Sequence, residues 1–157
     1  MSTQFSVAAA TLIAVLAAGG LVTAQGRVMA SATGSGQVTI NGTMRTFAFT
    51  VNRDASGTAS GQLEVINRDQ GLRSHARLNC LSVVGNTAII SGQINDSNSP
   101  AWEDAYVWLK VVDNGEGSKA PADKLTLVYS VIPAFTCDFD AAVPYLDVEK
   151  GNIQIRP

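Results

Sequence analysis

Few side chains in this sequence have reactive chemistry: two cysteines, Cys80 and Cys137, and a single histidine, His75. A nucleophilic cysteine needs a neighbouring base and a lowered thiol pKa, and strand alternation puts His75 and Cys80 on opposite faces unless a β-bulge intervenes. A zinc site needs about four ligands, more than these residues supply. An even pair of cysteines usually forms a disulfide in an oxidising compartment. We therefore predict a Cys80–Cys137 disulfide.

His75 gives little support for catalysis on its own. A Ser-His-Asp triad needs only one histidine, but the G-x-S-x-G elbow that presents the serine is absent from the sequence. The strand–turn–helix setting of that elbow is absent as well. We expect His75 to be a surface histidine on the outside of a β-structure.

Three acidic residues surround one glycine-rich turn. The stretch DNGEG contains Asp113 and Glu116, and Asp123 ends the same polar region. Their oxygens are ligands that calcium prefers, which makes them a calcium candidate, but the D-x-[DN]-x-[DN]-G spacing of an EF-hand loop is absent. The simpler interpretation is a turn that uses Asn and Gly because both tolerate positive φ.

The remaining carboxylates show no acid–base pair in the sequence. Glu103 and Asp104 are adjacent and would face opposite sides of a strand. Asp138 and Asp140 flank Phe139, but no feature selects them as the two carboxylates of a glycosidase. The sequence therefore predicts no catalytic residue, no metal beyond the calcium candidate, and no cofactor.

Aromatic residues form the more distinctive set. Trp102, Tyr106 and Trp108 share one parity, whereas the residues between them form a continuous aliphatic face from 105 to 111. We expect the aliphatic face to be the core face, so the aromatic face points outward with Lys110. Either an irregular segment over 133–150 covers it, or it is a flat platform for a glycan or a surface protein. Trp102, Tyr106 and Trp108 are the candidate binding face.

The elements that must position these residues are β-strands. Alternating stretches occur along the chain, and Asn41-Gly42 is the turn pair of a tight hairpin. The stretches are QVTI, MRTFAFTV, QLEVINR, LRSHARLNCLSV, TAIISGQI, AYVWLKVV, KLTLVYSVI and GNIQI. A change of parity near Cys80 predicts a β-bulge. About eight strands with polar-out alternation favour a single antiparallel barrel or sandwich, with no helix outside the N-terminal segment.

The N-terminus has the pattern of a signal peptide. FSVAAATLIAVLAAGGLV is apolar and uncharged, and Val22-Thr23-Ala24 supplies short residues before a cleavage point at Gln25. We predict a signal peptide over 1–24, a flexible segment over 25–35 and an all-β domain over 36–157. An uncleaved N-terminal anchor is the alternative. The predicted location is secreted or extracellular, which includes the periplasm and the cell surface.

The charge balance argues against some partners. The chain has 11 Lys and Arg residues against 13 Asp and Glu residues, and no basic patch is dense enough to indicate nucleic-acid binding. No stretch after the signal peptide is apolar enough to predict a membrane partner.

Several stretches resemble a family of exported bacterial all-β domains of uncharacterised function. NCLSVVGNTAIISGQI fits the pattern C-L-x-V-x-G-N-x-A-x-I-x-G, and the turn VVDNGEG and the final strand GNIQI fit in order and spacing. The resemblance implies an extracellular β-domain, and the placement of Cys80 and Cys137 matches the family. It implies no catalytic residue. The stretch SPAWEDAYVW departs from the pattern because it is richer in aromatic residues.

Taken together, these observations predict a secreted non-catalytic β-domain with a binding or scaffolding role outside the cytoplasm. The first alternative is a β-barrel that carries a small ligand in its interior. The second is a hydrolase that depends on carboxylates.

Overall fold

The computed structural model describes residues 27–117, 119–133 and 136–157, so the predicted signal peptide over 1–24 lies outside the described residues. The described residues form one antiparallel sheet of nine strands in the order β8-β7-β6-β5-β4-β3-β2-β1-β9. The strands are β1 (Val28–Ile40), β2 (Thr43–Asp54), β3 (Ala59–Asn67), β4 (Leu72–Val84), β5 (Thr87–Ser97), β6 (Tyr106–Val112), β7 (Lys124–Ser130), β8 (Leu146–Asp147) and β9 (Lys150–Arg156). The all-β antiparallel prediction is confirmed, and the described ranges contain no helix.

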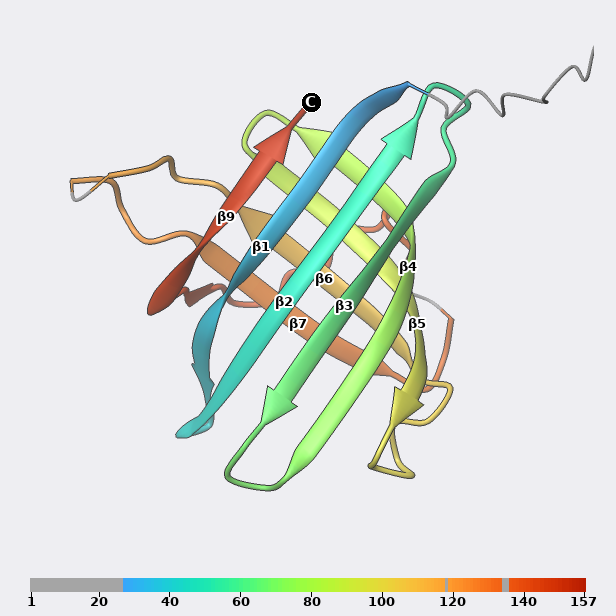
Figure 1. Cartoon of the computed structure of the whole chain (residues 1–157), viewed down its shortest axis with the longest axis vertical. Coiled ribbons are helices and arrows are strands. Elements are labelled where there is room, and N and C mark those ends of the chain that lie inside the picture. Colours follow the sequence, from blue (N-terminus) through green and yellow to red (C-terminus); the bar gives the residue numbers. More distant parts are fainter. Residues whose placement is uncertain (1–26, 118, 134–135) are drawn as a thin grey trace, which may run out of the picture.

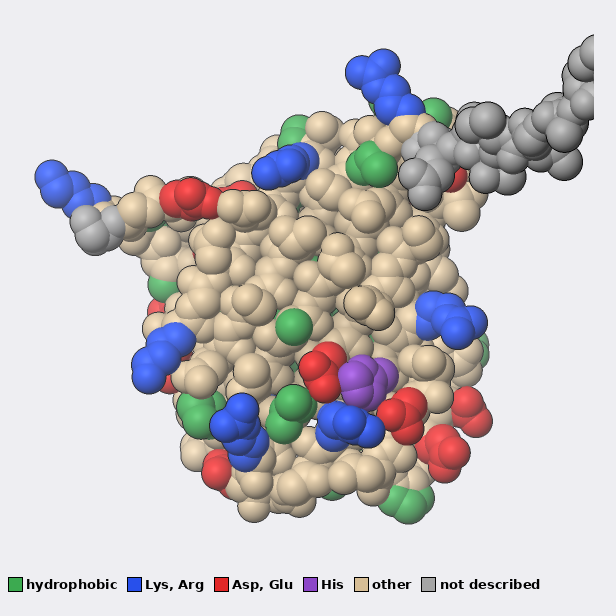
Figure 2. Space-filling model, viewed as in Figure 1, with side chains coloured by type: hydrophobic (Ala, Val, Ile, Leu, Met, Phe, Trp, Pro, Cys, Tyr) green, Lys and Arg blue, Asp and Glu red, His purple; other side chains and the backbone are tan. Residues whose placement is uncertain are grey.

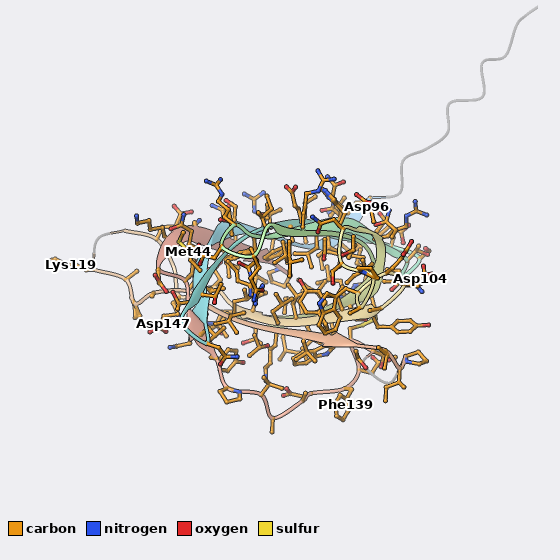
Figure 3. The ribbon with its side chains drawn as sticks, turned by 90° about the horizontal axis from the view of Figure 1, so that it is seen from below. Met44, Asp96, Asp104, Lys119, Phe139 and Asp147 are labelled. Carbon is orange, nitrogen blue, oxygen red and sulfur yellow. A yellow bond between two sulfur atoms is a disulfide. The ribbon has the colours of Figure 1, made fainter. Side chains whose placement is uncertain are left out.

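The sheet curls into a half-barrel. β9 and β1 to β4 lie in front of β6 and β7 and cross them in the view of Figure 1. Seen from below, in Figure 3, the two layers enclose a row of packed side chains. Because one continuous sheet forms both layers, the fold is closer to the predicted barrel than to a sandwich of two sheets. The strand that was not predicted is the two-residue β8.

The interior follows the predicted alternation. The Asn41-Gly42 turn has positive φ at both residues, 51° and 75°, as the sequence indicated. The aliphatic face of β6 lies in the core, and so do the predicted inward residues of β2 and β3. The fully buried large side chains of the interior include Val38, Phe47, Val51, Leu78, Ile90, Ile94, Val107, Leu109, Val111, Leu125 and Ile153.

Two glycines allow the sheet to curl. Gly61 pairs with Val51 and Leu78, and Gly92 pairs with Leu78 and Val107, so all five residues form one row that crosses from β2 to β6. A Cβ atom at Gly61 would lie 2.2 Å from a backbone oxygen of β2, and one at Gly92 would lie 2.1 Å from a backbone oxygen of β4. Only glycine permits such close approach between strands, which is how a strongly coiled sheet is built.

A β-bulge in β4 reverses the orientation of its side chains, as predicted. The register with β5 shifts between Leu78 and Cys80, which leaves Asn79 as the extra residue. Leu78 and Leu81 are therefore both buried in the interior. Cys80 is turned to the outer face of the sheet, where it can reach the C-terminal half of the chain.

The prediction of a flexible segment over 25–35 is wrong for residues 28–35. They form the first part of β1, which pairs with β2 on one side and with β9 on the other. The composition SATGSG is typical of a linker, but small residues are required here. A Cβ atom at Gly34 would lie 2.7 Å from the ring of Phe49, and one at Gly36 would lie 2.4 Å from the carbonyl oxygen of Lys150.

Candidate functional site

The predicted disulfide is present and fixes a segment over the outer face of β5, β6 and β7. Cys80 and Cys137 are bonded, with their Cα atoms 5.7 Å apart. We call residues 136–145 the covering segment, since they cross these strands without forming a strand themselves. Figure 3 shows Phe139 on this segment, outside the two layers of the sheet.

The covering segment buries Trp108 on the outer face of β6. Trp108 has no exposed surface, and its indole Nε1 donates a hydrogen bond of 3.2 Å to the carbonyl oxygen of Phe139. The Nζ of Lys110 lies 2.7 Å from both carboxylate oxygens of Asp140. Ser91 and Thr126 on the neighbouring strands are also buried. The outer face of β6 is therefore a second, smaller core that the chain itself covers.

The candidate binding face of Trp102, Tyr106 and Trp108 is accordingly wrong as a single exposed surface. Trp108 is buried, Tyr106 is half-buried, and Trp102 stacks on Tyr129 with ring centroids 4.9 Å apart. The parity argument fails at Trp102 because this residue lies in a turn before β6, where Asp104 has a φ of 60°.

The calcium candidates hold the edge of β9. Asp123 accepts hydrogen bonds from the backbone N–H groups of Asn114 at 2.8 Å and Ile153 at 2.7 Å. Asp113 does the same for Gly115 at 2.8 Å and Ile155 at 3.0 Å.

Glu116 accepts hydrogen bonds from the side-chain amides of Asn152 and Gln154 on the same strand. We call Asp113, Glu116 and Asp123 the β9 clasp. Its oxygens serve protein donors, and among the described residues no group of three or more His, Cys, Asp or Glu residues is placed to hold a metal ion.

A groove of about 610 Å³ lies on the outer face of β2 to β5 and is the site that the sequence did not reveal. Its lining includes the small residues Ala48, Gly61 and Ala76, and also Phe49 and Leu63, which are buried core residues. Polar side chains form its walls: Thr50, Gln62, Glu64, His75, Arg77, Asn95 and Asp96. Arg77 and Asn95 also line an adjoining hollow with Asn79, Gln93 and Asp104.

The register explains why these side chains converge. Thr50, Gln62 and Arg77 are direct cross-strand partners, and the row continues to Gln93 and Tyr106. Partners in a row share one face of the sheet. The sequence shows each residue as an ordinary outward position, and only the strand register, with a second irregularity of β5 beside Asn95, brings them together.

Charges in the groove are balanced. The Nε2 of His75 lies 3.4 Å from a carboxylate oxygen of Glu64, and Arg73 lies 3.5 Å from Asp96. Figure 2 shows the histidine with acidic and basic side chains around it, below a broad field of uncharged surface. His75 lies on the outer face, as expected. Because positive and negative groups alternate, the groove has no strong preference for a charged ligand.

Three long or amide side chains of the groove have uncommitted polar groups. Gln62, Arg77 and Asn95 make no side-chain hydrogen bond or ion pair with any other described residue. Together they present two amides, each with donors and an acceptor, and one guanidinium with five donors. A ligand that binds these groups breaks no contact within the protein.

Because Tyr129 is partly buried, we expect the free energy of unfolding to fall at high pH. Burial raises the pKa of its hydroxyl to about 12, so between pH 10 and 12 the unfolded state holds fewer protons and the free energy of unfolding falls as the pH rises. Urea unfolding at about pH 8 and about pH 11 should show a smaller fall for Tyr129→Phe than for the wild type. Asp140 raises the pKa of Lys110. This effect is the same in the wild type and in Tyr129→Phe, so it does not change the comparison. Equal falls would contradict the prediction.

No protein-family model, no curated protein and no solved structure matches this chain. The resemblance to exported bacterial all-β domains stays a prediction. Within the described residues, no helix has the length and apolar character to cross a bilayer.

Proposed function

We propose that this domain acts outside the cytoplasm as a non-catalytic binding module, and that its ligand is a neutral, hydroxyl-rich saccharide held in the groove over β2 to β5. The observation that carries the proposal is the uncommitted set of Gln62, Arg77 and Asn95 in that groove. The Cys80–Cys137 disulfide is consistent with an oxidising, extracellular setting.

The chemistry of the groove favours a sugar. Sites for drug-like ligands of roughly 300–1,000 Å³ are mostly apolar, whereas most residues that line this one are polar or charged. A sugar hydroxyl both donates and accepts, which matches the amides of Gln62 and Asn95 and the donors of Arg77. Glu64 and Asp96 are offset by Arg77 and by Arg73, which lies 3.5 Å from Asp96, and this balance favours a neutral ligand over an ionic one.

The contacts of His75 support binding rather than catalysis. Among the described residues, its Nε2 lies 3.4 Å from a carboxylate oxygen of Glu64, and no serine, threonine or cysteine lies within hydrogen-bond distance of its ring. A nucleophile and its base normally lie within such a distance, although free enzymes can show looser geometry. The alternative of a ligand-carrying interior has less support because large side chains such as Phe47, Ile90 and Leu109 fill it.

Arg77→Ala is expected to weaken saccharide binding by at least about tenfold, close to 1.4 kcal/mol, because it removes the donors that line both the groove and the adjoining hollow. Gln62→Ala should weaken it less. The measurement is isothermal titration calorimetry with a panel of neutral hexasaccharides of glucose and N-acetylglucosamine.

Arg156→Ala is the matched control, since it removes the same charge from an exposed position on β9, away from the groove. Its affinity should equal that of the wild type. Equal affinity of Arg77→Ala and Arg156→Ala, or tighter binding of a polyuronic acid than of every neutral sugar, would refute the assignment. Failure of the whole panel to bind would do the same.

A further inference from the structure

The two edges of the sheet differ in how their outward backbone groups are satisfied. At one end, the β9 clasp satisfies the outward N–H groups of Ile153 and Ile155. At the other end, β8 covers only the first two residues of β7, where Leu146 and Asp147 pair with Leu125 and Lys124. Residues 126–130 of β7 have no strand partner on that side among the described residues.

The free side of β7 presents unpaired backbone groups. The N–H of Val148 donates to the carbonyl oxygen of Asp123, and backbone groups of alternate residues in a strand point to the same side. The N–H and C=O groups of Leu127 and Tyr129 therefore point where β8 would continue. No described residue forms a hydrogen bond with them on that side.

This edge lacks the usual protection against strand pairing. Natural edge strands are blocked by charges, prolines or bulges. Residues 126–130 include no charged residue and no proline, and the register of β7 with β6 is regular. The two residues that follow β7, Val131 and Ile132, are 78% and 57% exposed. The contrast with the clasped β9 edge indicates that β7 is left open.

We propose that the free edge of β7 over 126–130 accepts an extended, uncharged segment of a partner protein, which adds to the sheet as a further antiparallel strand. Main-chain hydrogen bonds to Leu127 and Tyr129 give such a complex its affinity, and alternate side chains give it specificity. Partner residues opposite Leu127 and Tyr129 share their inward face, beside the Trp102–Tyr129 stack, so they should be apolar.

The shape of the molecule favours a single strand over a second copy of this chain. Figure 1 shows the ends of β3 and β4 projecting past β7 in the layer in front of it. Two copies paired through β7 would be related by an axis perpendicular to the sheet. Both sets of projecting ends would then lie on the same side and meet, whereas an isolated extended chain has no such layer.

The test is backbone hydrogen exchange with a defined probe, a short capped peptide that alternates Val and Thr and has a terminal lysine at each end for solubility. Bound peptide should slow exchange at the amides of Leu127 and Tyr129 by roughly tenfold or more. A second peptide, N-methylated at the residues that pair with them, should give no protection, because it lacks the donors.

Tyr129→Pro and Tyr129→Ala form the matched pair of variants. Both remove the ring, but only proline removes the outward N–H, and proline is tolerated where that group faces solvent. Tyr129→Ala should keep peptide binding and Tyr129→Pro should lose it. Should Tyr129→Pro fail to fold, the N-methylated peptide makes the same distinction on the wild type.

Three outcomes would overturn the proposal: no protection at Leu127 and Tyr129 at millimolar peptide, equal protection by both peptides, or concentration-dependent protection without peptide. The last would identify a second copy as the occupant. A further matched pair, Val131→Lys and Val84→Lys, alters residues that are each 78% exposed. Only Val131→Lys should weaken binding of the peptide, since Val84 lies at the β4–β5 turn.

Discussion

Replacing both cysteines in C80S/C137S should lower the free energy of unfolding by about 4 kcal/mol, as the chain-entropy model gives for a loop of this length. The cysteines are 57 positions apart, so the disulfide removes a large loop from the unfolded ensemble. Urea unfolding of the oxidised wild type, the reduced wild type and the variant measures the effect. Reduced wild type and variant should coincide.

The same change should expose Trp108. Without the disulfide, the contacts left to hold the covering segment include the hydrogen bond to Trp108 and the Lys110–Asp140 pair. Asp140 is mostly exposed, and such a pair is worth roughly 0–1 kcal/mol. In a Trp102→Phe background, Trp108 should be protected from an aqueous quencher when the protein is oxidised and accessible when it is reduced.

Asn79→Ser is the control for the cysteine variant, because Asn79 is the exposed bulge residue next to Cys80. It should leave the unfolding midpoint and the quenching unchanged. A cysteine variant that unfolds within about 1 kcal/mol of the oxidised wild type would show that the covering segment is held by packing alone.

Alternation and turn chemistry made most of the fold predictable. The Asn41-Gly42 turn, the inward residues of β2 and β3 and the bulge near Cys80 all depend on local steric rules that a sequence displays directly. The start of β1 was missed because Gly34 and Gly36 are small for a tertiary reason. They make room for Phe49 and for the backbone at Lys150, and no local pattern shows this.

The site was less predictable because it depends on register. Gln62 and Arg77 are neighbours only because β3 and β4 pair as they do, and a groove of outward polar residues has no motif. The exposure of the aromatic residues was predicted wrongly for the opposite reason. Trp108 has the parity of a surface residue, yet the covering segment packs over it. A disulfide from the outer face of β4 was the available signal that the chain returns across that face.

Asp123→Ala should lower the free energy of unfolding by about 3 kcal/mol, because it removes charge-assisted hydrogen bonds and leaves a buried donor unsatisfied. Asp123 is 6% exposed. It accepts a hydrogen bond from the N–H of Ile153, a residue that is completely buried. The loss should be local first. Amide exchange in β9 should accelerate more than exchange in β3 or β4, which backbone hydrogen exchange can measure.

Asp113→Ala is the matched control, since Asp113 makes the same kind of contacts, to Gly115 and Ile155, from a less buried position. It should lower the free energy of unfolding by about 1 kcal/mol, because water can replace part of the hydrogen bonding that the carboxylate provides. Equal losses in the two variants would contradict the role of burial.

Adding calcium tests whether the β9 clasp is a metal site. Each carboxylate oxygen of Asp113 and Asp123 already accepts a backbone N–H, and calcium binds by taking six to eight oxygen ligands. Millimolar calcium should therefore leave the unfolding midpoint of the wild type unchanged. A rise in the midpoint that Asp123→Ala abolishes would mean that these carboxylates exchange their backbone partners for the ion, and that β9 is held by a metal rather than by direct hydrogen bonds.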